Sequence, residues 1–485
     1  MMSQISARRG EWSTEERLIN HVSNVRFEDL PDEVVRYCKL LMIDSLGVMF
    51  PGSRAPGCPE LINLVKSWGG QESGSSILIH GHKTSPPFAA LANSVMMHAL
   101  DFDDTLDSSA LHTFVNVLPA ALATAEHAKL VDGKRFITAL VLGVDVICRI
   151  ATAIKRPLSW IRTATCGSFG AAATAAKILE LEGNGLLNAL GIVYSQSAGN
   201  AQGLIEGRLV KRMQPGFASQ AGVISAFLAK TGITGSHHFL EGRYGFYNLY
   251  EQGEYDPHPI YDKLGEHYTI LDVSVKPYPC CRMTHASIDA ALELRKTIQN
   301  IPDDITGIEV AVSEMVAEMV GKPFKLGSDP QVDAQFSIPY TTSVALLRGD
   351  VFLEDFEVSS ICQESVQQLA KKVHVVVDPH VPAKDILHAR MTVKTRDGEV
   401  HETKIDAPLG NPRNLLGIDG CEKKFRRCLL ASGLEIDESK TDELLSLIED
   451  LEQIQDIKHL ISLMQIQSAR SNQKHGTLKN AKANI

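Results

Sequence analysis

The spacing of apolar residues divides the chain into regions with different predicted secondary structure. From Ser13 to about Leu264 apolar residues recur mainly at helical spacing, as in 167–181, 186–203 and 217–232. These runs are rich in Ala and Gly, and small side chains let neighbouring helices approach closely. The region 1–267 is therefore predicted to be a large all-helical domain.

The pattern changes after His267. Residues 305–316, 371–380 and 389–405 are strand-like, and the last run contains an Asp397-Gly398 turn typical of a β-hairpin. Helical patterns at 284–298 and 335–349 accompany these strands. The region 268–405 is therefore predicted to be a smaller α+β domain, which makes the fold class mainly α with two domains.

The remainder of the chain is helical again through Met464, and we expect residues 406–468 to return and pack on the first domain. The final residues, 469–485, are polar and are expected to form a disordered tail. A length of 485 residues fits more than one folded unit.

Composition excludes several kinds of partner. A net charge of −10 and a pI near 5.9 provide no basic field for nucleic acid. No signal-like apolar segment begins the chain, and no run approaches the ~18 apolar residues of a membrane span, so we expect a cytoplasmic protein without membrane contact. The nine scattered cysteines, with Cys280 and Cys281 adjacent, favour reduced thiols over disulfides or zinc.

The densest polar cluster is MHALDFDDT, residues 97–105, followed by His112. If the preceding Ala-rich segment is helical, Asp101 lies one turn after His98, and Asp104 and Thr105 lie one turn after Asp101 on the same side. The cluster is either a solvated helix end, where Asp, Ser and Thr are common, or part of a functional site.

One functional alternative is a magnesium-dependent phosphatase. DFDDT matches the DxDxT box of haloacid-dehalogenase-type phosphatases, and GDVFLED, residues 349–355, imitates the distal acidic motif of that family. The box must stand at the tip of a buried parallel strand, whereas residues 87–97 read as a helix. Short motifs such as this one also match by chance often.

Two further segments gather cations. GRLVKRMQPG, residues 207–216, places Arg208, Lys211 and Arg212 in a predicted loop before a helix, where anions are attracted. KPYPCCRMTH, residues 276–285, presents Lys276 and Arg282 on a proline-stiffened segment suited to carboxylates. Taken alone, the first is equally compatible with a solvated basic loop and the second with a domain connector.

Together these segments resemble one family, the MmgE/PrpD proteins. The matching pieces are HALDFDDT with His112, TATCGSFGAAATAAK, KRMQPGFASQAG, KPYPCCRMTHASIDA, FSIPYTTSVALLRGD and GNPRN. The resemblance implies a large helical domain with a smaller α+β lid, a homodimer, and cofactor-free and metal-free chemistry on a small carboxylate substrate. Its members include 2-methylcitrate dehydratase, cis-aconitate decarboxylase and iminodisuccinate epimerase.

The resemblance also implies which residues line the cleft between the domains. His112 is the expected proton-transfer group, because an unperturbed imidazole titrates close to working pH. Lys211 and Lys276 would hold substrate carboxylates and stabilise an enolate, and Asp101 would orient a base or act as an acid/base itself. Hydroxyl groups are expected from Tyr340 and Thr105, and further substrate contacts from Asp104, Arg162, Arg212, Cys281 and Arg282.

Two positions depart from the decarboxylase pattern. Ile161 stands where a His is expected before the Gly/Ala-rich helix, and Cys281 stands where the animal decarboxylases have a His. Cys281 is either an acid/base thiol or a small buried residue, and the second reading is favoured. Arg162 could add a carboxylate contact beside Ile161.

The sequence thus predicts a lyase or isomerase that transfers a proton next to a carboxylate. Dehydration is the first expectation, epimerisation the second and decarboxylation the third. The phosphatase and a non-catalytic binding member of the family remain as alternatives.

Overall fold

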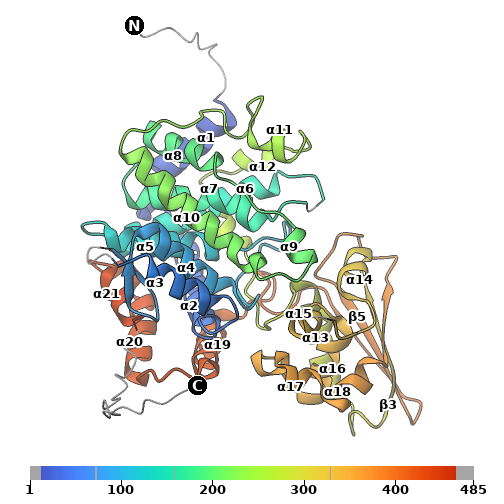
Figure 1. Cartoon of the computed structure of the whole chain (residues 1–485). Helices are drawn as coiled ribbons and strands as arrows, with labels where there is room; N and C mark the ends of the chain where they lie inside the picture. The colour runs from blue at the N-terminus through green and yellow to red at the C-terminus, as the bar shows by residue number, and fades with distance from the viewer. Residues whose placement is uncertain (1–11, 71–73, 158, 328, 466–485) are drawn as a thin grey trace, which may run out of the picture.

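The computed structural model describes residues 12–70, 74–157, 159–327 and 329–465, which form a large helical unit and a smaller mixed unit (Figure 1). The larger unit contains α1 (Thr14–Asn24), α2 (Asp32–Gly52), α3 (Cys58–Ser67), β1 (Ser75–Ile77), β2 (His82–Thr84), α4 (Pro86–His98), α5 (Phe114–His127), α6 (Gly133–Thr152), α7 (Arg162–Ile178), α8 (Asn184–Tyr194), α9 (Gln202–Ile205), α10 (Val210–Lys230), α11 (Phe246–Tyr250) and α12 (His258–Tyr261).

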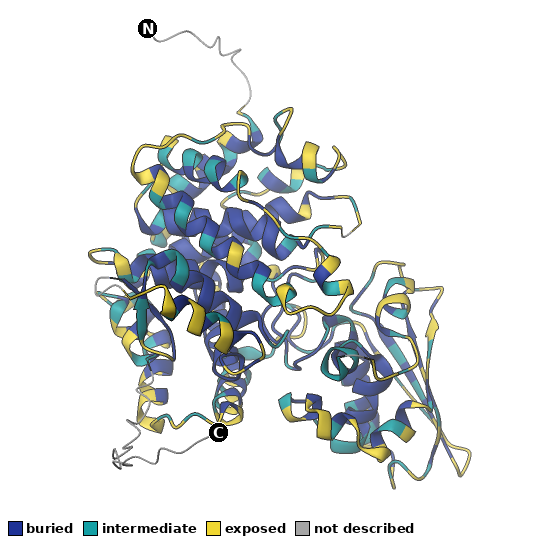
Figure 2. Ribbon diagram, viewed as in Figure 1, coloured by how far each residue is buried: buried dark blue, intermediate teal, exposed yellow. Residues whose placement is uncertain are grey.

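Helices α6 and α7 pack closely because glycine occupies their crossing. A Cβ atom on Gly170 would lie 2.1 Å from Ile147 Cγ1 and 2.6 Å from the carbonyl oxygen of Gly143. The neighbouring helices α4, α5 and α10 complete a buried layer around this crossing (Figure 2). The Ala/Gly-rich runs of the sequence therefore form the centre of the large core.

The smaller unit is a four-stranded sheet covered by helices. It contains α13 (His285–Arg295), β3 (Ile305–Val312), α14 (Glu314–Val320), α15 (Pro330–Gln335), α16 (Ile338–Arg348), α17 (Val358–Ile361), α18 (Glu364–Ala370), β4 (Val373–Val377), β5 (Ala389–Thr395) and β6 (Val400–Ile405). The strand order is β4-β3-β5-β6, with β3 and β4 parallel and the other pairs antiparallel. Gly398, at φ +89°, closes the predicted hairpin between β5 and β6.

The chain then returns to the large unit through α19 (Gly417–Ser432), α20 (Glu438–Glu449) and α21 (Lys458–Leu463). Phe425 of α19 packs on Gly47 of α2, where an added Cβ would meet the Phe425 Cα at 2.9 Å. Side chains of all three helices join the large core. The expected tail, 469–485, lies outside the described residues.

The boundary between the two cores lies later in the chain than the expected position at Tyr268. Tyr268, Ile270, Val273 and Val275 pack in the large core, whereas the small core begins at Tyr278. The predicted fold class, mainly α with a smaller α+β unit, is confirmed.

The phosphatase interpretation is wrong on structural grounds. Residues 86–98 form helix α4, so DFDDT follows a helix and not a buried parallel strand. GDVFLED begins at Gly349, the left-handed cap of α16 at φ +75°, and ends in the 3-10 turn η4 (Leu353–Phe356). Asp355 accepts a hydrogen bond from the Phe352 backbone N–H at 2.7 Å, so this acidic segment caps a turn.

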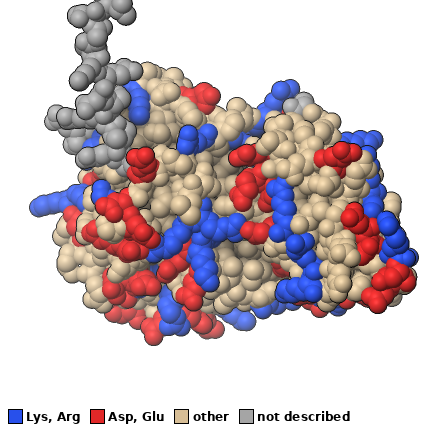
Figure 3. Space-filling model, turned by 90° about the horizontal axis from the view of Figure 1, so that it is seen from below, with Lys and Arg blue, Asp and Glu red and all other residues tan. Residues whose placement is uncertain are grey.

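The surface charge and the hydropathy of the helices agree with the absence of a basic field and of a membrane span in the sequence. On the face in Figure 3, Lys and Arg lie interspersed with Asp and Glu. Within the described ranges, no helix combines the length and apolar character needed to cross a membrane.

The glycine crossing gives a prediction about stability. Gly170→Ala should lower the free energy of unfolding by roughly 1–3 kcal/mol, because its Cβ would overlap Ile147 and the α6 backbone. Gly185→Ala in α8 is the matched control, since its Cβ would meet nothing closer than 3.4 Å and alanine favours helix. Thermal melting checks both variants, and equal melting temperatures for Gly170→Ala and wild type would contradict this account.

Candidate active site

The polar cluster lies on the loop between α4 and α5, and it does not continue the helix. Helix α4 ends at His98, and Asp101 adopts a left-handed conformation at φ +53°. The expectation that Asp101, Asp104 and Thr105 share one helical face is therefore wrong, because the backbone turns sharply at Asp101. The turn directs neighbouring carboxylates to different partners.

Asp101 forms ion pairs with two lysines from distant parts of the chain. Its Oδ1 lies 3.2 Å from Lys211 Nζ and its Oδ2 lies 3.3 Å from Lys276 Nζ, which also donates to the Asp101 carbonyl at 3.0 Å. Burial opposes ionisation of Asp101, but the lysines outweigh burial and hold its pKa far below the ordinary value. Burial would lower the pKa of Lys276, but Asp101 reverses the shift and raises it. Asp101 and Lys276 are therefore both charged at neutral pH.

Asp103 lies between two imidazoles and is completely buried. Its Oδ2 is 2.9 Å from His98 Nδ1 and 3.0 Å from His112 Nδ1. Burial would raise the pKa of Asp103, but His112 and His98 outweigh burial and hold that pKa well below its ordinary value. The shared carboxylate fixes the orientation of both rings, which meet edge to face with centroids 4.8 Å apart.

The hydrogen bonds of His112 leave one ring nitrogen available. Its Nδ1 lies 2.7 Å from the carbonyl oxygen of Asp104 and therefore carries the proton. Its Nε2 lies 3.8 Å from Asp101 Oδ1, beyond hydrogen-bond distance. The His112 side chain is 14 % exposed.

His98 connects this group to Lys211. Burial lowers the pKa of His98 to about 4, although Asp103 opposes the shift. The neutral ring donates from Nδ1 to Asp103, and its Nε2 accepts from Lys211 Nζ at 3.1 Å. The contacts of His98 with Asp103 and Lys211 thus hold the Lys211 ammonium group next to Asp101.

The returning helix α19 supports the loop from behind. Lys424 Nζ lies 2.6 Å from Asp44 Oδ1 and donates to the carbonyl oxygen of Phe102 at 2.8 Å. The same ammonium group stands 3.8 Å from the centroid of the Phe102 ring. Phe102 separates Asp101 from Asp103, so Lys424 fixes the backbone from which both carboxylates project.

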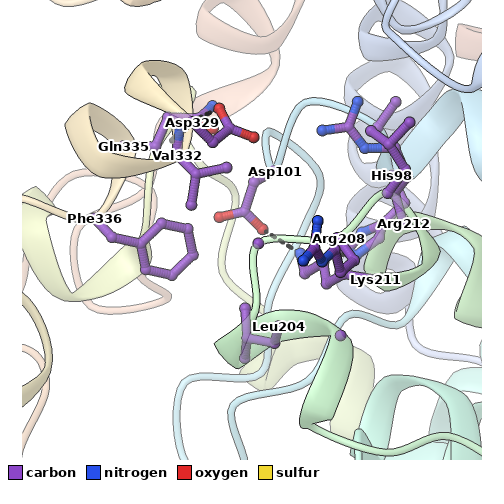
Figure 4. Close-up of a pocket in the computed structure, with 14 residues that line it drawn as sticks. His98, Asp101, Leu204, Arg208, Lys211, Arg212, Asp329, Val332, Gln335 and Phe336 are labelled. Carbon is purple, nitrogen blue, oxygen red and sulfur yellow. Dashed lines mark hydrogen bonds and ion pairs between the residues drawn. The ribbon is translucent and has the colours of Figure 1, made fainter. Parts of the chain in front are cut away.

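The basic segment expected to be a loop is one only at Arg208, which precedes α10, whereas Lys211 and Arg212 are helical. Helix α10 begins at Val210, so Lys211 and Arg212 occupy its first turn and Pro215 lies inside the helix. A small cavity, partly open to solvent, lies beside this turn. Figure 4 shows the ion pair between Asp101 and Lys211, both of which line the cavity. Arg212 lines the cavity as well, but it donates to the carbonyl oxygen of Pro56 at 2.9 Å.

Cys281 also belongs to this neighbourhood. Burial, with Asp101 beside it, raises the pKa of its thiol to about 11, so the sulfur keeps its proton at neutral pH. Its backbone N–H donates to the carbonyl oxygen of Gln335, which lines the cavity from the smaller unit.

Several predicted site residues have structural partners instead. Asp104 accepts hydrogen bonds from the backbone N–H groups of Thr113 and Phe114 at 2.7 and 3.0 Å, which anchors the start of α5. Thr105 is buried and exchanges backbone hydrogen bonds with Ser274 at 2.8 and 2.7 Å.

Three more predicted residues lie apart from the lysine pair. Arg162 donates to the carbonyl oxygens of Ser109 and Arg156, at 3.3 and 2.7 Å. Arg282 is buried and its Nε lies 3.1 Å from Asp107 Oδ1, an ion pair between the loop and the connector. Tyr340 is fully buried in the small core, with its hydroxyl group donating to the carbonyl oxygen of Asp355.

Sequence reasoning missed His98 and Asp103 as site residues. Both were visible in MHALDFDDT, but neither matched a named role, and their pairing across five positions depends on the sharp turn at Asp101. The available signal was the number of carboxylates in the motif. It holds three Asp residues, and each buried carboxylate needs its own partner.

His98, Asp103 and His112 are also the one group of metal-ligand types in the described part of the chain with donor atoms within 4.8 Å of one another. Both Nδ1 atoms stand at hydrogen-bond distance from the same Asp103 oxygen. The ammonium group of Lys211, 3.1 Å from His98, would repel a divalent cation. The donor set is better suited to holding protons than a metal ion.

The fold and site define a two-unit, mainly helical protein with an acid/base and cation cluster where the units meet. The family model described as MmgE/PrpD N-terminal domain matches residues 16–258, and the MmgE/PrpD C-terminal domain matches residues 278–451. The chain belongs to the MmgE/PrpD family. The family prediction made from the motifs is thereby confirmed.

Relatives match over nearly the whole chain. A cis-aconitate decarboxylase-like protein of Aspergillus oryzae is 28 % identical, covering 92 % of this chain and 96 % of its own. The cis-aconitate decarboxylase of Aspergillus terreus is 26 % identical, with 91 % and 94 % covered. The 2-methylcitrate dehydratase of Salmonella typhi is 23 % identical, with 84 % and 91 % covered. The prediction of an enzyme of this family is confirmed.

The environment of His98 gives a prediction about pH. Because its folded pKa of about 4 lies below the ordinary 6.5, the folded protein binds fewer protons than the unfolded chain between these values, and it loses stability as pH falls through them. In ¹³C-histidine spectra, the resonance absent from His98→Gln should titrate near pH 4. A midpoint near 6.5 would contradict the assignment.

Proposed function

We propose that the protein is a lyase that transfers a proton at a carbon next to a carboxylate of a small di- or tricarboxylate, with no metal or cofactor. The observation that carries this proposal is the grouping of Lys211, Lys276 and an oriented His112 around Asp101. This arrangement places groups for anion binding and proton transfer around Asp101, which lines the cavity together with Lys211.

The lysines are spaced to bind a carboxylate. Lys211 and Lys276 each approach a different oxygen of Asp101, at 3.2 and 3.3 Å. A substrate carboxylate would share or replace Asp101 at these ammonium groups. Removal of a proton from the adjacent carbon spreads negative charge onto that carboxylate, and the fixed ammonium groups stabilise the charge as it develops.

His112 is the proposed proton-transfer group. Its Nδ1–H is engaged by the carbonyl oxygen of Asp104 and by Asp103, at 2.7 and 3.0 Å. The basic lone pair is therefore on Nε2, which lies 3.8 Å from Asp101 Oδ1. Asp103 stabilises the ring once Nε2 has accepted a proton, as a buried carboxylate does in acid/base pairs.

Dehydration remains the first candidate reaction. His112 would remove the proton, and the hydroxyl group on the neighbouring carbon would leave as water after protonation by a second acid. The Cys281 thiol, protonated at neutral pH, is available for that step. Decarboxylation is the second candidate, because the two Aspergillus relatives with the higher identities carry decarboxylase names.

Substitutions at the cluster test the site. His112→Gln should reduce turnover by about 10²–10⁴-fold because the proton acceptor is lost. Lys211→Met should reduce kcat/KM because a carboxylate partner is lost. Proton NMR in D₂O with citrate, 2-methylcitrate and cis-aconitate would follow water loss, CO₂ loss and exchange of the α-proton.

Lys230→Met is the matched control for Lys211→Met, because Lys230 is exposed at the other end of the same helix α10. It should retain wild-type turnover. Full activity of both His112→Gln and Lys211→Met, with folding verified by melting, would overturn the site assignment.

Metal independence is tested separately. Turnover and α-proton exchange should be unchanged after dialysis against EDTA, because the proposed steps use only imidazole, ammonium and thiol groups. Loss of activity in EDTA, restored by Mg²⁺ or Zn²⁺, would reject the metal-free mechanism.

A further inference from the structure

The loop after α4 turns at a residue with an uncommon backbone conformation. Asp101 has φ +53°, in the left-handed region that residues other than glycine seldom adopt. Such a conformation persists where neighbouring contacts hold the backbone in place. The donors that bind the carbonyl oxygens around Asp101 therefore help to determine where its carboxylate lies.

Three consecutive carbonyl oxygens at this turn accept hydrogen bonds from side chains of three different segments. Lys276 of the connector donates to the carbonyl oxygen of Asp101, and Lys424 of α19 donates to that of the following residue. The preceding carbonyl oxygen, that of Leu100, accepts from Gln335 Nε2 at 3.2 Å. Gln335 belongs to α15, so the smaller unit supplies one of these three donors.

The side chain of Gln335 is itself held in place. It is the last residue of α15 and is only 6 % exposed. Its Nε2 also donates to the carbonyl oxygen of Pro279 at 2.8 Å, and its own carbonyl oxygen accepts from the Cys281 backbone N–H at 3.0 Å. Because an amide nitrogen carries two hydrogens, it can bind both carbonyl oxygens at once. Gln335 thus ties the loop after α4 to the connector that carries Lys276.

Gln335 also lines the cavity together with Asp101. Figure 4 shows it on the wall that belongs to the smaller unit, beside Asp329 and Val332. A direct contact with substrate is therefore an alternative role for this side chain. The positioning role is favoured because both hydrogens of the amide nitrogen already have carbonyl partners in the protein.

We propose that Gln335 is a positioning residue for the candidate site. By holding the Leu100 carbonyl oxygen it fixes the turn at Asp101, and with it the carboxylate that pairs with Lys211 and Lys276. The geometry of these ion pairs then depends on the packing of the smaller unit against the loop. The link to catalysis rests on the function proposed above, whereas the link to the loop rests on the hydrogen bonds alone.

Hydrogen exchange followed by mass spectrometry tests the link to the loop without substrate. The backbone N–H groups of Asp101 and Thr105 are hydrogen-bonded to carbonyl oxygens, so they exchange when the loop opens. In Gln335→Met, a peptide covering 99–105 should exchange about fivefold faster or more, because the amide that holds the closed loop is lost. Peptides of α6 should exchange as in wild type. Unchanged exchange of 99–105, or an equal rise along the whole chain, would overturn the proposal.

Two further variants separate hydrogen-bond donation from other effects. Gln367→Met is the matched control, because Gln367 Nε2 donates to the carbonyl oxygen of Ile361 at 2.7 Å within the smaller unit. It should leave exchange of 99–105 and turnover unchanged. Gln335→Glu keeps the shape of the side chain, but at pH 8 its carboxylate has no hydrogen to donate. It should loosen the loop as Gln335→Met does, and wild-type exchange in Gln335→Glu would reject donation as the cause.

Kinetics distinguish positioning from direct contact with substrate. Positioning predicts that Gln335→Met lowers kcat by about tenfold or more, because displaced charges stabilise the developing charge less well, and leaves KM within about threefold. A raised KM with unchanged kcat would indicate direct contact and would overturn the positioning role, as would unchanged kinetics despite faster loop exchange.

The role of Gln335 and the proposed function can fail independently. Faster exchange of 99–105 in Gln335→Met, in a protein that shows no lyase activity as wild type, would reject only the proposed function. Lyase activity in the wild type with unchanged loop exchange in Gln335→Met would reject only the role of Gln335.

Discussion

The contact on which the site depends is the carboxylate of Asp101 between the ammonium groups of Lys211 and Lys276. The three residues come from the loop after α4, the first turn of α10 and the connector to the smaller unit. Removing one partner from a buried ion pair costs about 3–5 kcal/mol, because the remaining charge is left uncompensated. The contact therefore couples the geometry of the candidate site to the joining of the two units.

The surrounding polar groups make this contact possible. A left-handed residue at Asp101 turns the loop, Lys424 holds the Phe102 carbonyl oxygen, and Arg282 ties the connector to Asp107. The residues responsible for these three features lie far apart in the sequence. The return of the chain through α19 thus supports the candidate site without lining it.

Apolar periodicity and turn chemistry predicted the helical unit, the β5–β6 hairpin and the returning helices, because these features are local. The motifs also identified Asp101, His112 and both lysines as candidates, and the structure brings these side chains together. Predictions from residue spacing were wrong where the backbone changes direction. The turn after His98 separates Asp104 from Asp101, and Asp104 instead binds the start of α5. The position of Tyr340 depends on long-range packing, which periodicity does not encode.

The arrangement also explains why so many ionisable groups can be buried together. Each carboxylate has a different role: Asp101 neutralises two lysines, Asp103 orients two imidazoles, and Asp104 anchors a helix. Asp101 and Lys211 line the cavity, and His112 and Lys276 stand next to Asp101. In the proposed reaction, a substrate carboxylate would redistribute charge at Asp101 while Asp103 and Asp104 keep the framework rigid, which is the preorganisation that stabilisation of an enolate requires.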